Sequence, residues 1–117
     1  MNRVLISVAT AALLACTQAA MAQDLAVGKK LFTDNCVRCH GASGQGGVGK
    51  KLKGDAAYWD FAIFQRTVMT GIDDEGKQMK IMPVFGKVGF TSPKGVTPTD
   101  TDLKNIQAYL KTFGPPD

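Results

Sequence analysis

The sequence predicts an all-α fold of three to four helices. Apolar residues recur at helical spacing in three segments of the chain, and no stretch alternates between apolar and polar residues as a half-buried strand would. Each of these segments also has residues that typically begin or end a helix. The chain of 117 residues contains no internal repeat, so we expect one small domain.

The first expected helix begins after Asp24 and ends just before Cys36. The Asp24 carboxylate can accept hydrogen bonds from the first free backbone N–H groups of a helix. Apolar and small residues then fall on one helical face: Leu25, Gly28, Leu31 and Phe32.

The other two expected helices lie in the second half of the chain. Residues 58–70 place three apolar side chains on the inner side, namely Phe61, Phe64 and Val68, and Gly71 suits a left-handed C-terminal cap. Residues 99–102 read Thr-Asp-Thr-Asp, which resembles a capping box. The helix expected after it has inner positions at Leu103, Ile106, Leu110 and Phe113, and Gly114-Pro115-Pro116 would stop it.

Residues 36–40 read Cys-Val-Arg-Cys-His. The C-x-x-C-H pattern is typical of covalent haem attachment, because two thiols three positions apart can each form a thioether to one vinyl group of the porphyrin. The histidine that follows at once can reach the iron from the proximal side. The sequence therefore predicts one haem c, attached through Cys36 and Cys39 and ligated by His40.

Three other interpretations of this motif each lack a component. A structural zinc site takes four Cys or His ligands, whereas residues 23–117 contain only Cys36, Cys39 and His40. A thioredoxin-like C-x-x-C motif needs a surrounding βαβ pattern, which is not visible here. A plain disulfide between the cysteines leaves the adjacent histidine without a role.

Residues 1–22 resemble a signal peptide. Arg3 supplies the charged start, residues 4–15 form an apolar run, and Ala20-Met21-Ala22 has the small-x-small form of a cleavage site. The run is too short to span a membrane. We therefore expect an exported, periplasmic domain of residues 23–117 with no transmembrane segment after cleavage, in an oxidising compartment suited to haem attachment.

A lipid anchor is the alternative to this cleavage. Leu13-Leu14-Ala15-Cys16 resembles a bacterial lipoprotein box, in which residues 1–15 would be the signal and Cys16 would carry the lipid. If Cys16 is removed instead, the mature chain keeps two cysteines, and both belong to the haem motif.

The order of these features resembles the small class I bacterial c-type cytochromes. A helix, C-V-R-C-H, a glycine-rich loop, a middle helix, a Met-Pro loop and a closing helix follow one another over residues 25–113. The resemblance implies the class I cytochrome c fold, in which the first and last helices cross at near right angles. Gly28 and Phe32 on one side and Tyr109 or Leu110 on the other would form that crossing. Cytochromes of the c-prime kind carry the motif near the C-terminus instead.

The resemblance also implies a methionine as the second axial iron ligand. Met82-Pro83 resembles the family's distal Met-Pro pair, and Met79 is the other candidate. Met69 lies in the expected middle helix, where a core role fits better. A pair of His and Met ligands closes both axial positions and raises the reduction potential, which suits electron transfer.

Residues 44–49 match G-x-G-x-x-G, but no strand precedes them, so we expect no dinucleotide site. Glycine here would let the backbone pass close to the porphyrin. The family usually has Gly-Pro-x-Leu-x-Gly at this point, and this chain has Gly49-Lys50-Lys51-Leu52-Lys53-Gly54. Leu52 keeps its place against the haem. Lys50 replaces the proline whose carbonyl accepts the ring N–H of the proximal histidine, and the Lys50 carbonyl can accept the same bond.

The formal net charge of +4 favours an acidic protein partner over nucleic acid. Lysines of the loops expected around the haem edge either are solvated charges or form a docking ring for an acidic redox partner: Lys50, Lys51, Lys53, Lys77, Lys80 and Lys87. Haem propionates need hydrogen-bond donors where they are buried, and Tyr58, Trp59 and Arg66 are candidates beside their ordinary core or surface roles.

These features predict a periplasmic monohaem electron carrier that is not an enzyme and that shuttles single electrons between a donor and an acceptor. Two alternatives stay open. One is a dedicated cytochrome subunit of a periplasmic dehydrogenase or oxidase complex. The other is a haem enzyme or gas-binding sensor, which needs an open axial position.

Overall fold

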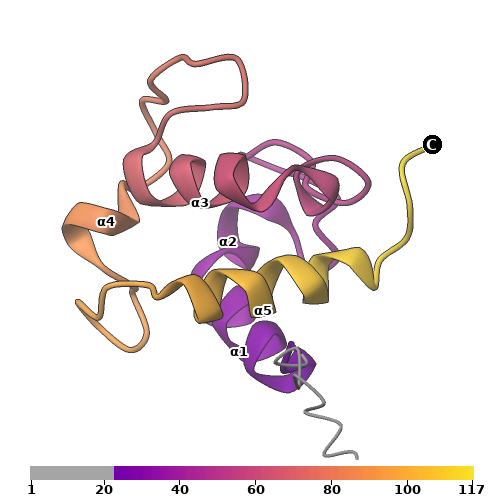
Figure 1. Cartoon of the computed structure of the whole chain (residues 1–117), viewed down its shortest axis with the longest axis horizontal. Helices are drawn as coiled ribbons and strands as arrows, with labels where there is room; N and C mark the ends of the chain where they lie inside the picture. Colours follow the sequence, from indigo (N-terminus) through magenta and orange to yellow (C-terminus); the bar gives the residue numbers. More distant parts are fainter. Residues whose placement is uncertain (1–22) are drawn as a thin grey trace, which may run out of the picture.

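The computed structural model of the chain describes residues 23–117. The helices are α1 (Leu25–Asn35), α2 (Val37–His40), α3 (Phe61–Thr70), α4 (Phe85–Val88) and α5 (Asp100–Lys111), with a 3-10 turn, η1, at Ala56–Tyr58 (Figure 1). Between residues 23 and 117 the only β pairing is an isolated bridge from Ile72 to Gln78. The all-α prediction is confirmed.

The signal peptide and the alternative lipid site at Cys16 lie outside the described residues. No helix of the described part is long and apolar enough to cross a membrane.

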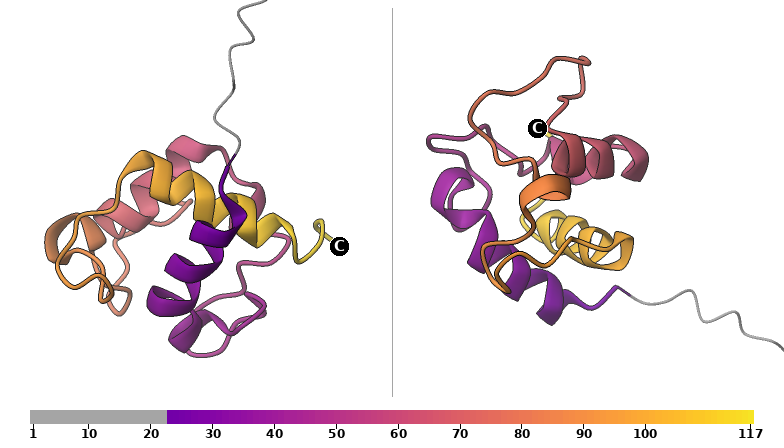
Figure 2. Two further views of the ribbon diagram at one scale, coloured as in Figure 1. Left: turned by 90° about the horizontal axis from the view of Figure 1, so that it is seen from below. Right: turned by 90° about the vertical axis from the view of Figure 1, so that its left-hand side faces the viewer.

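Helices α1 and α5 cross in close contact (Figure 2, left). Gly28 is buried at the crossing, where a Cβ atom would overlap the backbone carbonyl of Asn105 and lie 3.1 Å from Cβ of Tyr109. The Phe32 ring packs beside the Tyr109 ring, with centroids 5.9 Å apart. Leu110 is fully buried. The expected crossing residues are therefore those that meet, and glycine is needed because the two backbones approach so closely.

The caps of the first and last helices are confirmed. The Asp24 side chain accepts from the Ala26 and Val27 N–H groups at 3.0 and 3.1 Å. Thr99 and Asp102 form a reciprocal capping box at the start of α5. These bonds satisfy backbone donors that have no partner within the helix.

Helix α5 ends at Lys111, two residues before Phe113. The Thr112 and Phe113 N–H groups bond to carbonyls three residues back, so the last turn tightens to 3-10 geometry. The Phe113 ring still packs on Tyr109, at a centroid distance of 5.0 Å.

The prediction of one helix over residues 58–70 is wrong at its start. Tyr58 closes the separate turn η1, Trp59 is extended with ψ 155°, and α3 begins at Phe61. The break is stabilised by a residue of α5, because the buried Gln107 amide donates to the Ala56 and Trp59 carbonyls at 3.2 and 2.9 Å. The end of the helix is as expected, since Gly71 adopts the left-handed conformation at φ 72°.

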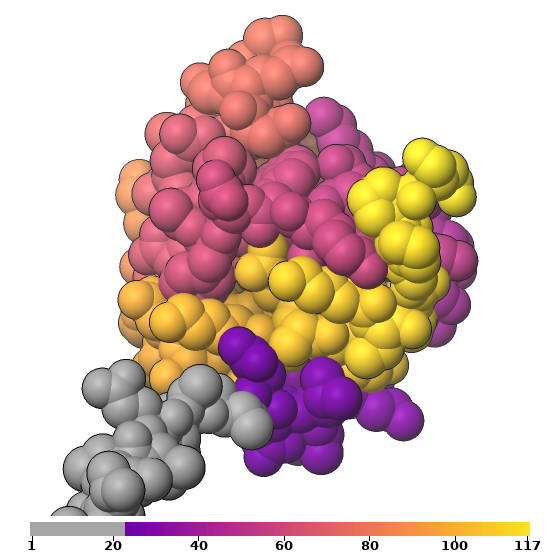
Figure 3. Space-filling model, turned by 45° about the vertical axis from the view of Figure 1, so that its right-hand side comes forward, coloured from indigo at the N-terminus to yellow at the C-terminus, as the bar shows by residue number. Residues whose placement is uncertain are grey.

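The buried core gathers around α5. Leu103, Ile106 and Leu110 of this helix pack with aromatic side chains of the other segments: Phe32, Phe64, Phe85 and Phe90. On the face drawn in Figure 3, α5 lies between α3 and α1. In the right-hand view of Figure 2, the loop after α2 and the segment leading into α4 lie on the same side of α3 and α5. The fold thus brings the C-x-x-C-H loop and the Met-Pro segment to one side of the core.

Candidate functional site

The C-x-x-C-H motif forms a helical turn of its own. Cys36 ends α1 and begins α2, and its carbonyl accepts from the Cys39 and His40 N–H groups at 3.2 and 3.0 Å. Gly41 stops the turn at φ 82°. Because residues three apart on a helix lie on one face, the two thiols leave the turn on the same side. Helix α2 is only four residues long and was not expected from the sequence.

Both described cysteines are free thiols, so the plain disulfide is not formed. Burial raises the pKa of the Cys36 thiol to about 12, with a smaller contribution from Cys39. A thiol of raised pKa is a poor redox nucleophile, because that role needs the thiolate. Within residues 23–117, no three His, Cys, Asp or Glu side chains gather where they could hold a metal ion.

The His40 ring is held by a backbone carbonyl. Its Nδ1 lies 2.7 Å from the Lys50 carbonyl oxygen. A carbonyl only accepts, so Nδ1 carries the proton and donates, which leaves the Nε2 lone pair free to bind a metal. The expected bond from His40 to Lys50 is therefore present, although the family's proline is absent.

Gly49 makes room for this arrangement. A Cβ atom at this position would lie 2.8 Å from Cε1 and 2.9 Å from Nδ1 of His40. The Gly49 N–H in turn donates to the Cys39 carbonyl at 2.8 Å, which ties the loop back to the motif. The glycine-rich loop is thus shaped around the histidine, and in the described residues no strand precedes it.

The three methionines of the described region differ in their surroundings. All three are half-buried, but only Met82 and Met69 pack against the hydrophobic core of the described residues, as Leu52 and Cys36 do. Met69 lies in α3 against Gly86 of α4, in agreement with a core role. Met79 follows the β bridge, and its N–H donates to the Gly71 carbonyl at 2.7 Å.

A family model described as cytochrome c matches residues 25–114. The chain belongs to the cytochrome c family. With the helical crossing described above, this agrees with the class I fold, and the cofactor of the family is a covalently bound haem c.

Similar proteins of this family include cytochrome c6 of Thermosynechococcus vestitus, with 30% identity over 105 residues, 89% of this chain and 83% of that protein. Cytochrome c6 of Thermostichus vulcanus is 29% identical over the same shares. The cbb3-type cytochrome c oxidase subunit FixP of Azorhizobium caulinodans is 34% identical over 94 residues, and this match spans 75% of the chain but only 29% of FixP. No solved structure shows significant similarity to the chain. The relatives support an electron-carrying role for this cytochrome.

Two unpaired polar atoms beside the core fit a haem carboxylate. Arg66 Nε is buried and has no hydrogen-bond partner among residues 23–117, while Nη2 of the same guanidinium donates to the Asp73 carbonyl at 2.7 Å. Thr67 Oγ1 is also buried and has no partner in this part of the chain. Such donors are costly to leave unsatisfied, so these atoms suit a group that brings its own acceptor oxygens. Thr67 was not among the residues expected from the sequence. Its position three residues after Phe64, on the inner face of the helix, is unusual for a polar side chain and could have indicated it.

The other two propionate candidates have different roles. The Trp59 indole N–H donates to the Asp55 carboxylate at 3.1 Å, so this donor is already occupied. Tyr58 is exposed, with the Lys111 ammonium 5.7 Å from its ring centroid. Both line a surface hollow of about 480 Å³ between α5 and the start of α3. Among the three candidates, only Arg66 thus has a buried donor without a partner in residues 23–117, and propionate binding by any of them stays a prediction.

The six loop lysines are not equivalent. Lys51 pairs with Asp117 at 3.2 Å, and Lys77 pairs with Glu75 at 3.5 Å. Lys53 is half-buried. The remaining three are exposed and have no ion pair with any residue of 23–117: Lys50, Lys80 and Lys87. Lys87 was expected in a loop but lies in helix α4.

Proposed function

We propose that this cytochrome is a periplasmic carrier of single electrons, with the haem attached through Cys36 and Cys39 and ligated by His40 and Met82. The observation that carries the proposal is the bond from His40 Nδ1 to the Lys50 carbonyl, because it fixes the ring and leaves Nε2 free. Bound haem c supplies a one-electron couple at its iron. The chain itself is not an enzyme in this proposal.

The residues of the chain keep the site in one state. The Lys50 carbonyl holds the imidazole in one orientation and increases its basicity as a ligand. Gly49 permits that contact, and Leu52 and Met82 supply apolar side chains that pack on the core and keep water out. With His40 and Met82 as the two axial ligands, no position at the iron would be left for a substrate.

Acid-acetone extraction tests the attachment. We expect the colour to stay with the protein, because thioethers survive acid, and a Cys36→Ser and Cys39→Ser double variant to yield no stable holoprotein. The visible spectrum of the reduced protein should not change under carbon monoxide. Colour moving into the acetone would refute covalent attachment, and a spectrum altered by carbon monoxide would favour the enzyme or gas-sensor alternative.

The docking surface in this proposal combines basic and apolar side chains. Lys50, Lys80 and Lys87 each lie within two residues of an exposed apolar side chain, namely Val48 (79% exposed), Ile81 (79%) and Val88 (61%). Exposed lysines steer an acidic redox partner, and the apolar side chains give contact area once it docks. Lys50 and Lys80 flank the two segments that hold His40 and Met82.

The mature protein in this proposal comprises residues 23–117, with cleavage after Ala22. Mass spectrometry of the exported protein distinguishes this product from one that begins at Cys16 and carries a lipid. A mass that includes residues 16–22 and acyl chains would contradict the soluble product and place the chain on a membrane surface.

A dedicated subunit of an oxidase or dehydrogenase complex is the second candidate. It is favoured by the match to FixP, which its name describes as a subunit of a cbb3-type cytochrome c oxidase. The match spans 29% of FixP. Purification of the tagged chain from membranes of its own cells separates the two. A free carrier elutes alone, whereas a subunit elutes with fixed stoichiometric partners.

A further inference from the structure

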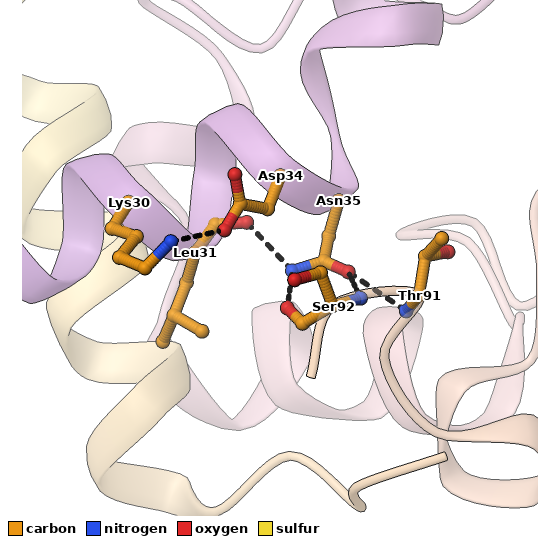
Figure 4. A network of polar contacts seen from close by, with 6 residues as sticks. All are labelled: Lys30, Leu31, Asp34, Asn35, Thr91 and Ser92. Carbon is orange, nitrogen blue, oxygen red and sulfur yellow. Dashed lines mark hydrogen bonds and ion pairs between the residues drawn. The ribbon is translucent and has the colours of Figure 1, made fainter. Parts of the chain in front are cut away.

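Asn35 is the last residue of α1 and directly precedes Cys36. Its side chain makes four hydrogen bonds (Figure 4). Nδ2 donates to the Leu31 and Ser92 carbonyls, each at 2.9 Å. Oδ1 accepts from the Thr91 and Ser92 N–H groups at 2.8 and 3.0 Å. The amide therefore uses both of its donors and both of its acceptor sites.

This arrangement fits asparagine and no other side chain. Two carbonyls face Nδ2 and two N–H groups face Oδ1, so the orientation of the amide is fixed by its partners. Aspartate would place an oxygen against the Leu31 and Ser92 carbonyls. Alanine would lose all four bonds.

The bonds join two parts of the chain that hold the proposed axial ligands. Asn35 makes every hydrogen bond that connects residues 23–55 with residues 79–98 in the described part of the chain. On one side, Cys36 bonds back to the Phe32 carbonyl at 2.8 Å and forward to His40, so Asn35 is rigidly connected to the motif.

On the other side, residues 84–96 form one hydrogen-bonded unit. The Val84 carbonyl accepts from the Lys87 N–H at 2.9 Å, and Phe90 exchanges bonds with Gly95 and Val96, each at 2.8 Å. The Phe90 ring packs on Phe85 at a centroid distance of 6.1 Å. Met82 lies two residues before this unit, with Pro83 restricting the backbone between them. Whatever holds Thr91 and Ser92 therefore also restrains the approach of Met82.

We infer that Asn35 is a positioning residue that keeps the Met82 segment against the Cys36–His40 segment and so retains methionine as the axial ligand. This inference rests on the proposed ligation by His40 and Met82. Packing of α4 on α3 through Gly86 and Met69 restrains the segment at α4, and the Asn35 bonds connect it to the end of α1.

Imidazole titration of the oxidised holoprotein tests the inference. Imidazole competes with Met82 for the iron, so its apparent affinity rises with the fraction of molecules in which Met82 has swung away. We expect Asn35→Ala to bind imidazole roughly tenfold more tightly, since three bonds to Thr91 and Ser92 are lost. Hydrogen exchange at the Thr91 and Ser92 amides should accelerate by a factor of about ten or more. If Asn35→Ala yields no holoprotein, Asn35→Asp, which keeps the two acceptor bonds, should show both changes at a smaller size.

Gln107→Ala is the matched control, because it removes a buried amide that joins η1 to α5 and that makes no hydrogen bond to residues 79–98. It should lower the thermal midpoint and leave the imidazole affinity unchanged. If the Asn35 variants behave like this control, with lower stability and unchanged imidazole affinity, the positioning role is wrong. Met82→Ala separates the two proposals. If this variant binds imidazole with the affinity of the parent protein, the proposed ligation by Met82 is wrong and the inference fails with it. If Met82→Ala binds imidazole tightly while the Asn35 variants bind it like the parent protein, only the inference is wrong.

Discussion

The His40 imidazole donates its Nδ1 proton to the carbonyl oxygen of Lys50 at 2.7 Å. The lysine side chain has no part in this contact, which uses only the backbone. A backbone acceptor is available from any residue type, so the bond to the imidazole survives the replacement of the family's proline. What the position does require is the right path of the chain, and Gly49 provides it by leaving space beside the ring.

Lys50→Pro should therefore be tolerated. The Lys50 N–H makes no hydrogen bond among residues 23–117, so proline removes no donor that the fold uses. The preceding residue is glycine, which suffers least from the restriction that proline places on its neighbour. We expect an unchanged visible spectrum and reduction potential and an equal or higher thermal midpoint, because proline reduces the freedom of the unfolded chain. A potential that moves clearly from the parent value would show that the carbonyl has shifted.

Gly49→Ala should damage the same site. The added Cβ would lie 2.8 Å from Cε1 of His40, so either the ring or the loop must move. We expect a loss of about 1–3 kcal/mol in the free energy of unfolding of the holoprotein, as for an overpacked core, together with a changed reduction potential. Gly47→Ala is the control in the same loop, because its Cβ would meet only the Cys39 carbonyl, at 3.2 Å. Equal effects of the two substitutions on the potential would argue against a specific contact with the imidazole.

Local signals were enough to predict the long helices and the motif. Asp24, Gly71 and the Thr99–Asp102 box act through hydrogen bonds or backbone angles within a few residues, so sequence contains the whole cause. The start of α3 could not be predicted in this way. It depends on Gln107, which is 48 residues away from Trp59 in the chain and fixes the break before the helix.

The same distinction applies to the site. Cys36, Cys39 and His40 are predicted by their spacing, and the Lys50 carbonyl by the resemblance of its loop to the family's pattern. The use of the Trp59 N–H by Asp55 and the four bonds of Asn35 depend on side-chain placement that spacing does not encode. The short helices α2 and α4 are single turns held by their surroundings and lack a periodic pattern of their own.

Met82→Ala should remove the weak sulfur-to-iron band near the red end of the spectrum of the oxidised protein, and Met79→Ala should keep it. The physical reason is that Met82 packs on the core beside Pro83, whereas the backbone of Met79 is engaged with Gly71 after the β bridge. Absorption spectra of the purified variants are sufficient. Loss of the band in Met79→Ala with retention in Met82→Ala would transfer the ligand role to Met79.

Reversing the charges of Lys50 and Lys80 to Glu should slow reduction by an acidic electron donor. The effect should fall mainly on the association rate and shrink as salt is added, since charges more than about 8 Å apart are largely screened near 0.15 M ionic strength. Lys29→Glu, on the exposed face of α1, is the control and should have little effect. Stopped-flow rates across a salt series provide the measurement, and rates that do not depend on salt would favour solvated charges without a docking role.

Arg66→Met should lower the reduction potential. Arg66 keeps one buried donor, Nε, without a partner among residues 23–117, and its charge lies next to the core where the haem carboxylate would fit. Removing a positive charge there favours the oxidised form, which carries one more positive charge at the iron. We expect a decrease of roughly 50 mV, which is near the 59 mV that corresponds to a tenfold change for one electron.

Lys104→Met is the control for this prediction. It removes an equal charge from the surface of α5, where the Lys104 ammonium lies 5.0 Å from the Phe61 ring centroid, and it should leave the reduction potential nearly unchanged. Thin-layer spectroelectrochemistry measures both variants, and equal shifts would mean that Arg66 acts only through the net charge of the protein, without contact to the haem carboxylate.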